Sequence, residues 1–152
     1  MYTPEEFDSY KTKVLKYVLY KKRTKQEVKN KFYNTIETDI LEDIIENLEE
    51  NGYIDDTNYI VRSIDEFKAL NNLSIKEIKY KLYSKGVSSS LVEDYISNNI
   101  EDLLEYELDS AKNIAIKKEN LMEEQDITKL LLKKGYMGES VKYALSQLSK
   151  KD

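Results

Sequence analysis

Apolar residues recur at intervals of three and four positions along most of the chain, and charged residues fill the positions between them. This spacing is typical of amphipathic helices that bury one face. The chain has only 4 glycines and 1 proline, Pro4. It therefore has too few turn-forming residues for the tight turns of an all-β fold, and no proline interrupts a later helix. The sequence predicts an all-α protein.

Two segments about fifty residues apart share caps, apolar positions and lysines. They are TKQEVKNKFYNT, which begins at Thr24, and SIKEIKYKLYSK, which begins at Ser74. Each opens with a capping box, in which the hydroxyl caps the first turn and Glu27 or Glu77 reaches back to the cap residue. Apolar residues four positions apart follow each box, and lysines recur at matching places. The match predicts an internal repeat.

A third, less regular copy begins near Glu124 and reads EQDITKLLLKKGYMGESVKYAL. Its Ile127 matches Ile78, and its Gly135 matches Gly86. A further amphipathic helix is expected ahead of each pair, over residues 11–20, 57–70 and 101–119. The predicted buried stripe of the last of these consists of Leu104, Leu108, Ala111 and Ala115.

These patterns predict three tandem units of three helices each within a single domain over residues 1–152. The approximate units are residues 11–54, 55–100 and 101–148. One unit buries too small a core to be stable alone, so neighbouring units must pack against one another. We expect them to form an elongated, slightly curved body.

The stretch LEENGYIDD, residues 48–56, raises the question of a metal site at Asp55 and Asp56. A metal would need four or more converging oxygen ligands, and no D-x-D-x-D-G loop is present. The alternative is that this stretch only ends one helix and begins the next. Gly52 ends one helix with a positive φ, Tyr53 and Ile54 fold back onto the core, and the aspartates begin the next helix. We favour the turn between two helices over the metal site.

The residue types narrow the possible chemistry. With 0 histidines and 0 cysteines, the chain lacks the residues of Ser-His, Cys-His and His-metal sites. No glycine-rich phosphate loop is present either. We therefore predict a non-enzymatic protein without a cofactor or metal. A carboxylate-based hydrolase would need two acids converging in a pocket, and every acidic run here reads as a solvated helix face.

The location is expected to be cytoplasmic. The first ten residues carry three acids and do not read as a signal peptide. The longest aliphatic run is Leu130–Leu132, which is too short to span a membrane. The absence of cysteine is compatible with a reducing compartment.

Charge is segregated along the chain. Residues 11–31 carry nine basic side chains and one acid, whereas residues 37–56 carry nine acids and residues 93–109 seven acids, both without a base. The second helix of each predicted unit is basic. If the units stack regularly, the molecule has a basic face and an acidic face suited to docking on a large, patterned partner. The alternative is that these are solvated helix surfaces without a partner.

Four segments resemble the RecX family of bacterial regulatory proteins, in order and spacing, over roughly residues 14–148. They are YKKRTKQEVKNKF from Tyr20, LEENGYIDDTNYI from Leu48, SIKEIKYKLYSKGV from Ser74 and LLLKKGYMGESVKYAL from Leu130. The first unit departs from the pattern, because Asn34, Thr35 and Ile36 stand where many members carry a glycine. Lysine also predominates over arginine here, and the net charge is −5.

The resemblance implies a modulator of the RecA recombinase. Such proteins lie in the groove of the RecA filament on single-stranded DNA and lower ATP hydrolysis, strand exchange and co-protease activity. We expect a monomer with only weak direct contact to DNA. The candidate partner-binding residues are Lys22, Arg23, Lys25, Lys79, Lys81, Lys85, Lys133 and Lys134. The alternative is a helical module that uses the same basic stripe to bind nucleic acid directly.

Overall fold

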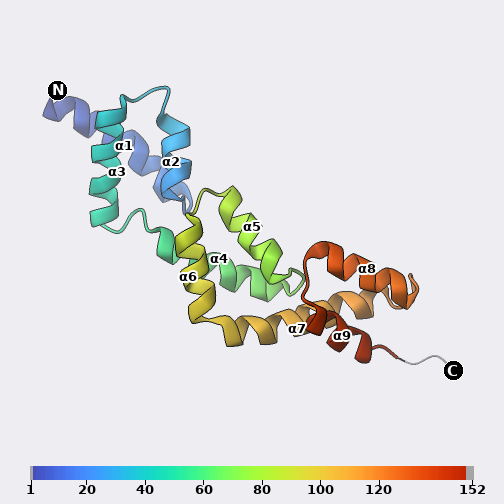
Figure 1. Ribbon diagram of the computed structural model, residues 1–152. Coiled ribbons are helices and arrows are strands. Elements are labelled where there is room, and N and C mark those ends of the chain that lie inside the picture. Colours follow the sequence, from blue (N-terminus) through green and yellow to red (C-terminus); the bar gives the residue numbers. More distant parts are fainter. Residues whose placement is uncertain (1, 150–152) are drawn as a thin grey trace. The chain divides into compact units, whose positions relative to one another are not determined.

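The computed structural model describes residues 2–149, and this part of the chain folds into nine α-helices and no strand (Figure 1). The helices are α1 (Pro4–Tyr20), α2 (Lys25–Phe32), α3 (Thr38–Glu50), α4 (Asp56–Leu70), α5 (Ile75–Ser84), α6 (Ser89–Asn98), α7 (Ile100–Lys118), α8 (Glu124–Lys134) and α9 (Gly138–Ser146). The all-α prediction is confirmed. Within the same residues, no helix is both long enough and apolar enough to cross a membrane.

The chain divides into two compact units. The first comprises the residues up to Val61 together with Tyr83–Ser88, and the second comprises Arg62–Leu82 and the residues from Ser89 onward. The order of the helices is compatible with three tandem three-helix repeats. The boundaries of the three repeats stay a prediction.

The core of the first unit lies between α1, α2 and α3. Val14, Val28 and Ile44, one from each helix, are completely buried there. Tyr17 meets Phe32 edge-to-face, with ring centroids 5.6 Å apart, a geometry that aromatic pairs favour. These contacts fix α2, whose eight residues are too few to form a stable helix alone.

Gly52 follows the last turn of α3 and has the predicted positive φ, at 79°. The N–H groups of Tyr53 and Ile54 both donate to the Leu48 carbonyl oxygen, at 2.8 and 3.3 Å. Ile54 turns back into the core and is only 2% exposed. Tyr53 is 45% exposed, so its predicted packing against the core was wrong.

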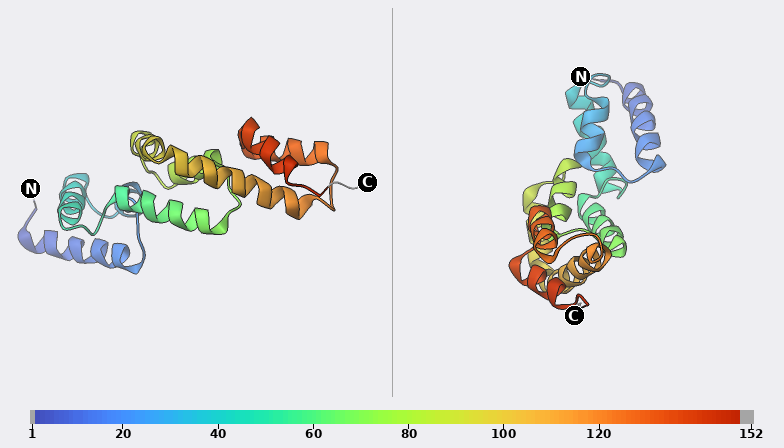
Figure 2. Two further views of the ribbon diagram at one scale, coloured as in Figure 1. Left: turned by 90° about the horizontal axis from the view of Figure 1, so that it is seen from below. Right: turned by 90° about the vertical axis from the view of Figure 1, so that its right-hand side faces the viewer.

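In the second unit, α7 lies alongside α8 and α9 (Figure 2). Ala111 and Ala115 are completely buried there, as the spacing predicted. The rest of the predicted stripe is wrong, because Leu104 is exposed and Leu108 is half-buried. The buried face is rotated by one position and contains Leu103 and Glu107 instead.

Candidate partner-binding surface

Within the first unit, the start of α2 lies against the residues that end α5. Thr24 is completely buried, and its Oγ1 accepts a hydrogen bond from the Glu27 N–H at 3.0 Å. The Glu27 carboxylate accepts one from the Thr24 N–H at 3.0 Å, so the predicted capping box is present. The Thr24 hydroxyl also donates to the Lys85 carbonyl oxygen at 2.6 Å. One side chain thus caps the start of α2 and binds the end of α5.

Gly86 follows Lys85 and permits this close approach. Its φ is 86°, and a Cβ built on it would lie 2.4 Å from the Gln26 Cβ. Any other residue would be strained in its backbone and would clash with α2. We call Thr24, Gln26, Lys85 and Gly86 the first joint.

Asp55 and Asp56 both serve helix starts. Asp55 Oδ1 accepts from the Asn58 N–H at 3.0 Å, so Asp55 caps α4 as predicted. Asp56 was expected to stabilise only the start of its own helix, but its Oδ1 accepts from the Lys25 N–H at 2.9 Å. Burial raises the pKa of Asp56, opposed by this hydrogen bond. These contacts support the interpretation that the two aspartates begin helices, and not that they form a metal site.

The second unit contains an equivalent joint, which comprises Ser74, Lys76, Lys134 and Gly135. The completely buried Ser74 donates to the Lys134 carbonyl oxygen at 2.7 Å, while its Oγ accepts from the Glu77 N–H at 3.0 Å. Gly135 has a φ of 96°, and a Cβ on it would lie 2.9 Å from the Lys76 Cβ. The second joint thus repeats the chemistry of the first.

Glu107 occupies the place at the second joint that Asp56 occupies at the first. It is completely buried on α7. Its Oε1 accepts from the Ile75 N–H at the start of α5, at 3.3 Å, and its Oε2 from the Ser140 hydroxyl in α9, at 2.9 Å. Burial raises the pKa of Glu107, opposed by hydrogen bonds from Ser140, Ile75 and the Met137 N–H.

Sequence reasoning missed this residue, because it counted Glu107 with the solvated acids of residues 93–109. A signal was available: Glu107 lies four residues after Leu103 and four before Ala111, on the stripe that is buried in the structure. Beside it, the hydroxyls of Tyr106 and Ser110 both donate to the Leu73 carbonyl oxygen, at 2.8 and 2.9 Å. The loop before α5 is therefore held by a buried polar network.

The structure places the eight predicted partner-binding residues in two groups. The first unit holds Lys22, Arg23, Lys25 and Lys85 around the first joint, whereas the second unit holds Lys79 and Lys81 on α5 and Lys133 and Lys134 at the end of α8. The hydrogen bond of Thr24 to Lys85 brings the start of α2 and the end of α5 together in the first group.

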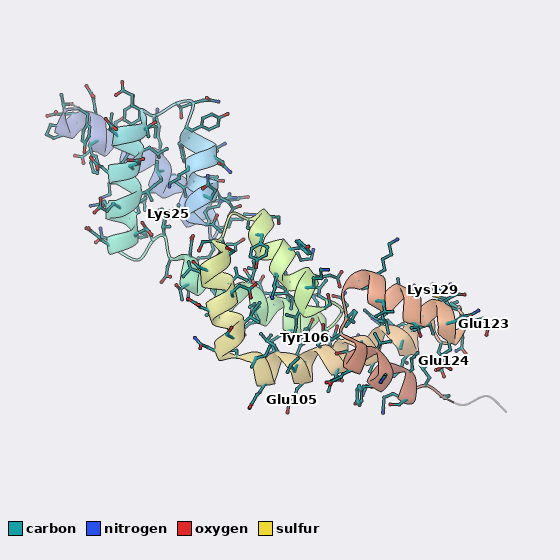
Figure 3. All side chains as sticks on the ribbon, in the orientation of Figure 1. Lys25, Glu105, Tyr106, Glu123, Glu124 and Lys129 are labelled. Carbon is teal, nitrogen blue, oxygen red and sulfur yellow. The ribbon has the colours of Figure 1, made fainter. Side chains whose placement is uncertain are left out.

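Several of these side chains already have partners within the chain. Lys25 (labelled in Figure 3) lies 3.1 Å from Glu49. Two more make ion pairs in the second unit, Lys79 with Glu93 at 3.1 Å and Lys134 with Glu77 at 3.2 Å.

Arg23 is held differently, because its guanidinium stacks over the Tyr17 ring at 4.0 Å. Lys22, Lys81, Lys85 and Lys133 are exposed.

Comparison with known proteins gives the chain its relatives. No protein-family model matches it. It is 32% identical over 133 residues to Regulatory protein RecX of Finegoldia magna, a match that covers 80% of this chain and 63% of that protein. The chain is homologous to the RecX regulatory proteins. A second RecX protein, from Streptococcus mutans serotype c, is 29% identical over 94 residues, 61% of this chain and 36% of the relative.

The fold is that of solved RecX structures. The crystal structure of RecX from Lactobacillus salivarius matches with a TM-score of 0.79 at 22% identity, over 96% of this chain and 98% of that one. A second RecX crystal structure matches with a TM-score of 0.81 at 21% identity, over 93% of this chain and 73% of that one. The resemblance to RecX proteins is confirmed, and the chain spans less than two thirds of the curated relatives it matches.

Proposed function

We propose that this protein is a regulator of the RecX type, which binds the RecA filament on single-stranded DNA. There it lowers ATP hydrolysis, strand exchange and co-protease activity, as a monomer in the cytoplasm. The observation that carries the proposal is the homology to Regulatory protein RecX over 133 residues. The RecX fold supports it.

The exposed lysines give the proposal a chemical basis. Lys22 lies near the first joint and Lys85 belongs to it, and Lys81 and Lys133 are exposed in the second unit. Ammonium groups at exposed positions speed encounter with an acidic surface and fix its register. Because the net charge is −5, bare nucleic acid attracts the whole molecule only weakly.

The proposal includes no catalytic step. The half-buried Asp56 and the buried Glu107 accept hydrogen bonds from the starts of α2 and α5. We propose three tandem repeats, at about residues 11–54, 55–100 and 101–148. The recurrence of the joint chemistry at Thr24 and Ser74 supports this division.

Co-sedimentation tests the proposal. RecA filaments assembled on single-stranded DNA with a slowly hydrolysed ATP analogue are pelleted with and without the protein. We expect the protein in the pellet only when filaments are present, and DNA alone to leave it in the supernatant. Equal retention by DNA without RecA would favour the alternative, a nucleic-acid-binding module. No retention in either sample would contradict both.

A further inference from the structure

The start of α8 corresponds to the starts of α2 and α5 but is left open. Ile127, Val28 and Ile78 each lie four residues after the cap position of their helix. At the first two joints the cap residues Thr24 and Ser74 are completely buried. Their counterpart Glu123 is exposed and makes no capping hydrogen bond through its side chain. Among the described residues, the end of α9 and the residues up to Ser149 line the space beside this helix start.

The cap residue also differs in chemistry. A hydroxyl can donate, and Thr24 and Ser74 use theirs to bind a carbonyl oxygen at the end of another helix. An ionised carboxylate at this place only accepts hydrogen bonds. A group that binds at Glu123 must therefore bring a donor, and a charged donor suits it best.

A hollow of about 960 Å³ lies at this helix start. Among the residues that the structure describes, its wall carries four acids, Glu119, Glu123, Glu124 and Asp126, and neither lysine nor arginine. Glu123 and Glu124 (labelled in Figure 3) lie at the N-terminal end of α8.

Apolar side chains from two elements form the rest of the wall. Leu121 and Met122 come from the turn between α7 and α8, and Leu145 and Leu148 come from α9 and the residues after it. Leu121 is 73% exposed and Met122 37% exposed. Exposed large apolar residues beside a hollow are typical of a binding surface.

We propose that this hollow docks a segment of a partner protein that carries a lysine or arginine beside a large apolar side chain. The cation meets Glu123 and Glu124, and the apolar side chain packs on Leu121 and Met122. The acidic wall repels a nucleic acid strand, which leaves a basic protein segment as the occupant. The inference does not depend on RecA, because it uses the acidic hollow and not the lysines assigned to the filament.

Fluorescence anisotropy with a labelled peptide of alternating lysine and leucine tests this proposal. The first comparison peptide has glutamate in place of lysine, and the second has serine in place of leucine. The protein variants are Glu123→Lys with Glu124→Lys, and Leu121→Ala. The matched controls are Glu139→Lys, an exposed acid on α9 outside the hollow, and Leu132→Ala, an exposed leucine on α8 outside it.

We expect the lysine–leucine peptide to bind best, and the double charge reversal to weaken its binding about tenfold or more. Leu121→Ala also weakens binding, whereas both control variants bind like the parent protein. Equal binding of the three peptides would overturn the proposal. Equal losses of binding affinity in the hollow variants and the control variants would also overturn it. Self-association of the protein that Glu123→Lys with Glu124→Lys abolishes would also overturn it, because a second copy would then be the occupant.

Discussion

Thr24 and Lys85, 61 residues apart in sequence, are joined by a hydrogen bond of 2.6 Å from the threonine hydroxyl to the lysine carbonyl oxygen. The bond ties the first turn of α2 to the end of α5 within the first unit. Ser74 and Lys134 repeat it in the second unit at 2.7 Å. One short buried side chain thus satisfies two groups of different helices, which makes each joint sensitive to single substitutions.

Removal of the joint hydroxyl is expected to destabilise the protein. Thr24→Val keeps the shape of the side chain but leaves the Glu27 N–H uncapped and removes the hydrogen-bond donor to the Lys85 carbonyl oxygen. We expect the free energy of unfolding in urea to fall by about 1–3 kcal/mol, and Ser74→Ala to have a similar effect. Thr12→Val, at an exposed hydroxyl on α1 that bonds only within its helix, is the control. Equal effects at Thr24 and Thr12 would contradict the joint.

The glycines provide a graded series. Gly138→Ala, at the first position of α9 with open space around it, is expected to leave stability unchanged or slightly raised. Gly52→Ala meets nothing within 4 Å but keeps a φ of 79°, which costs about 1 kcal/mol. Gly86→Ala has the same backbone strain and a clash with Gln26, and is expected to lose the most. Thermal unfolding of the three variants checks this order, which a smaller loss at Gly86 than at Gly52 would contradict.

Glu107 predicts a pH dependence of stability. Its pKa is raised from the ordinary value of 4.5 in the folded protein. Above pH 4.5 the folded state therefore holds more of this proton than the unfolded state, so the free energy of unfolding falls as pH rises through the raised pKa. The neutral variant Glu107→Gln lacks this loss. We expect the parent protein to lose stability relative to Glu107→Gln as pH rises from 4.5.

The measurement is urea unfolding of both proteins at several pH values. Groups from α5 and α9 face this carboxyl, namely the Ile75 and Met137 N–H groups and the Ser140 hydroxyl. The titratable neighbours are Tyr106 and Tyr136. Glu105→Gln, at an exposed position of the same helix (labelled in Figure 3), controls for the loss of one acid. If the difference in free energy of unfolding between the parent protein and Glu107→Gln stays constant across the pH range, burial does not raise the pKa of Glu107.

Local signals in the sequence predicted most of the helices, caps and turns. The boxes at Thr24 and Ser74, the positive φ of Gly52 and the cap at Asp55 depend on neighbours within a few residues. Each is fixed by backbone hydrogen bonding and sterics, which a short stretch of sequence specifies.

Tertiary contacts could not be predicted in the same way. The capping boxes indicated that Thr24 and Ser74 start helices, but not that their hydroxyls bind carbonyl groups 60 or more residues away. Glu107 was predicted to be solvated because a carboxylate is seldom buried. The hydrogen bonds that compensate for its burial come from two helices distant in sequence. The ion pairs of Lys25, Lys79 and Lys134 likewise depend on the arrangement of helices.

The exposed lysines are expected to contribute to filament binding. Lys22→Glu with Lys85→Glu reverses two charges around the first joint without removing a hydrogen bond of the joint, because Lys85 contributes only its backbone there. We expect about tenfold weaker binding to RecA filaments, and weaker binding of the parent protein as salt rises. Lys16→Glu, at an exposed position on α1, is the control. Equal binding of all three proteins in a co-sedimentation titration would remove these lysines from the interface.

We expect this homologue of RecX proteins to restrain RecA, and the DNA-dependent ATPase of RecA is the activity to measure. RecA is assembled on single-stranded DNA, the protein is titrated in, and the rate of ATP hydrolysis is followed. We expect the rate to fall as the protein approaches stoichiometry with RecA. An unchanged rate at and above equal concentrations would contradict it.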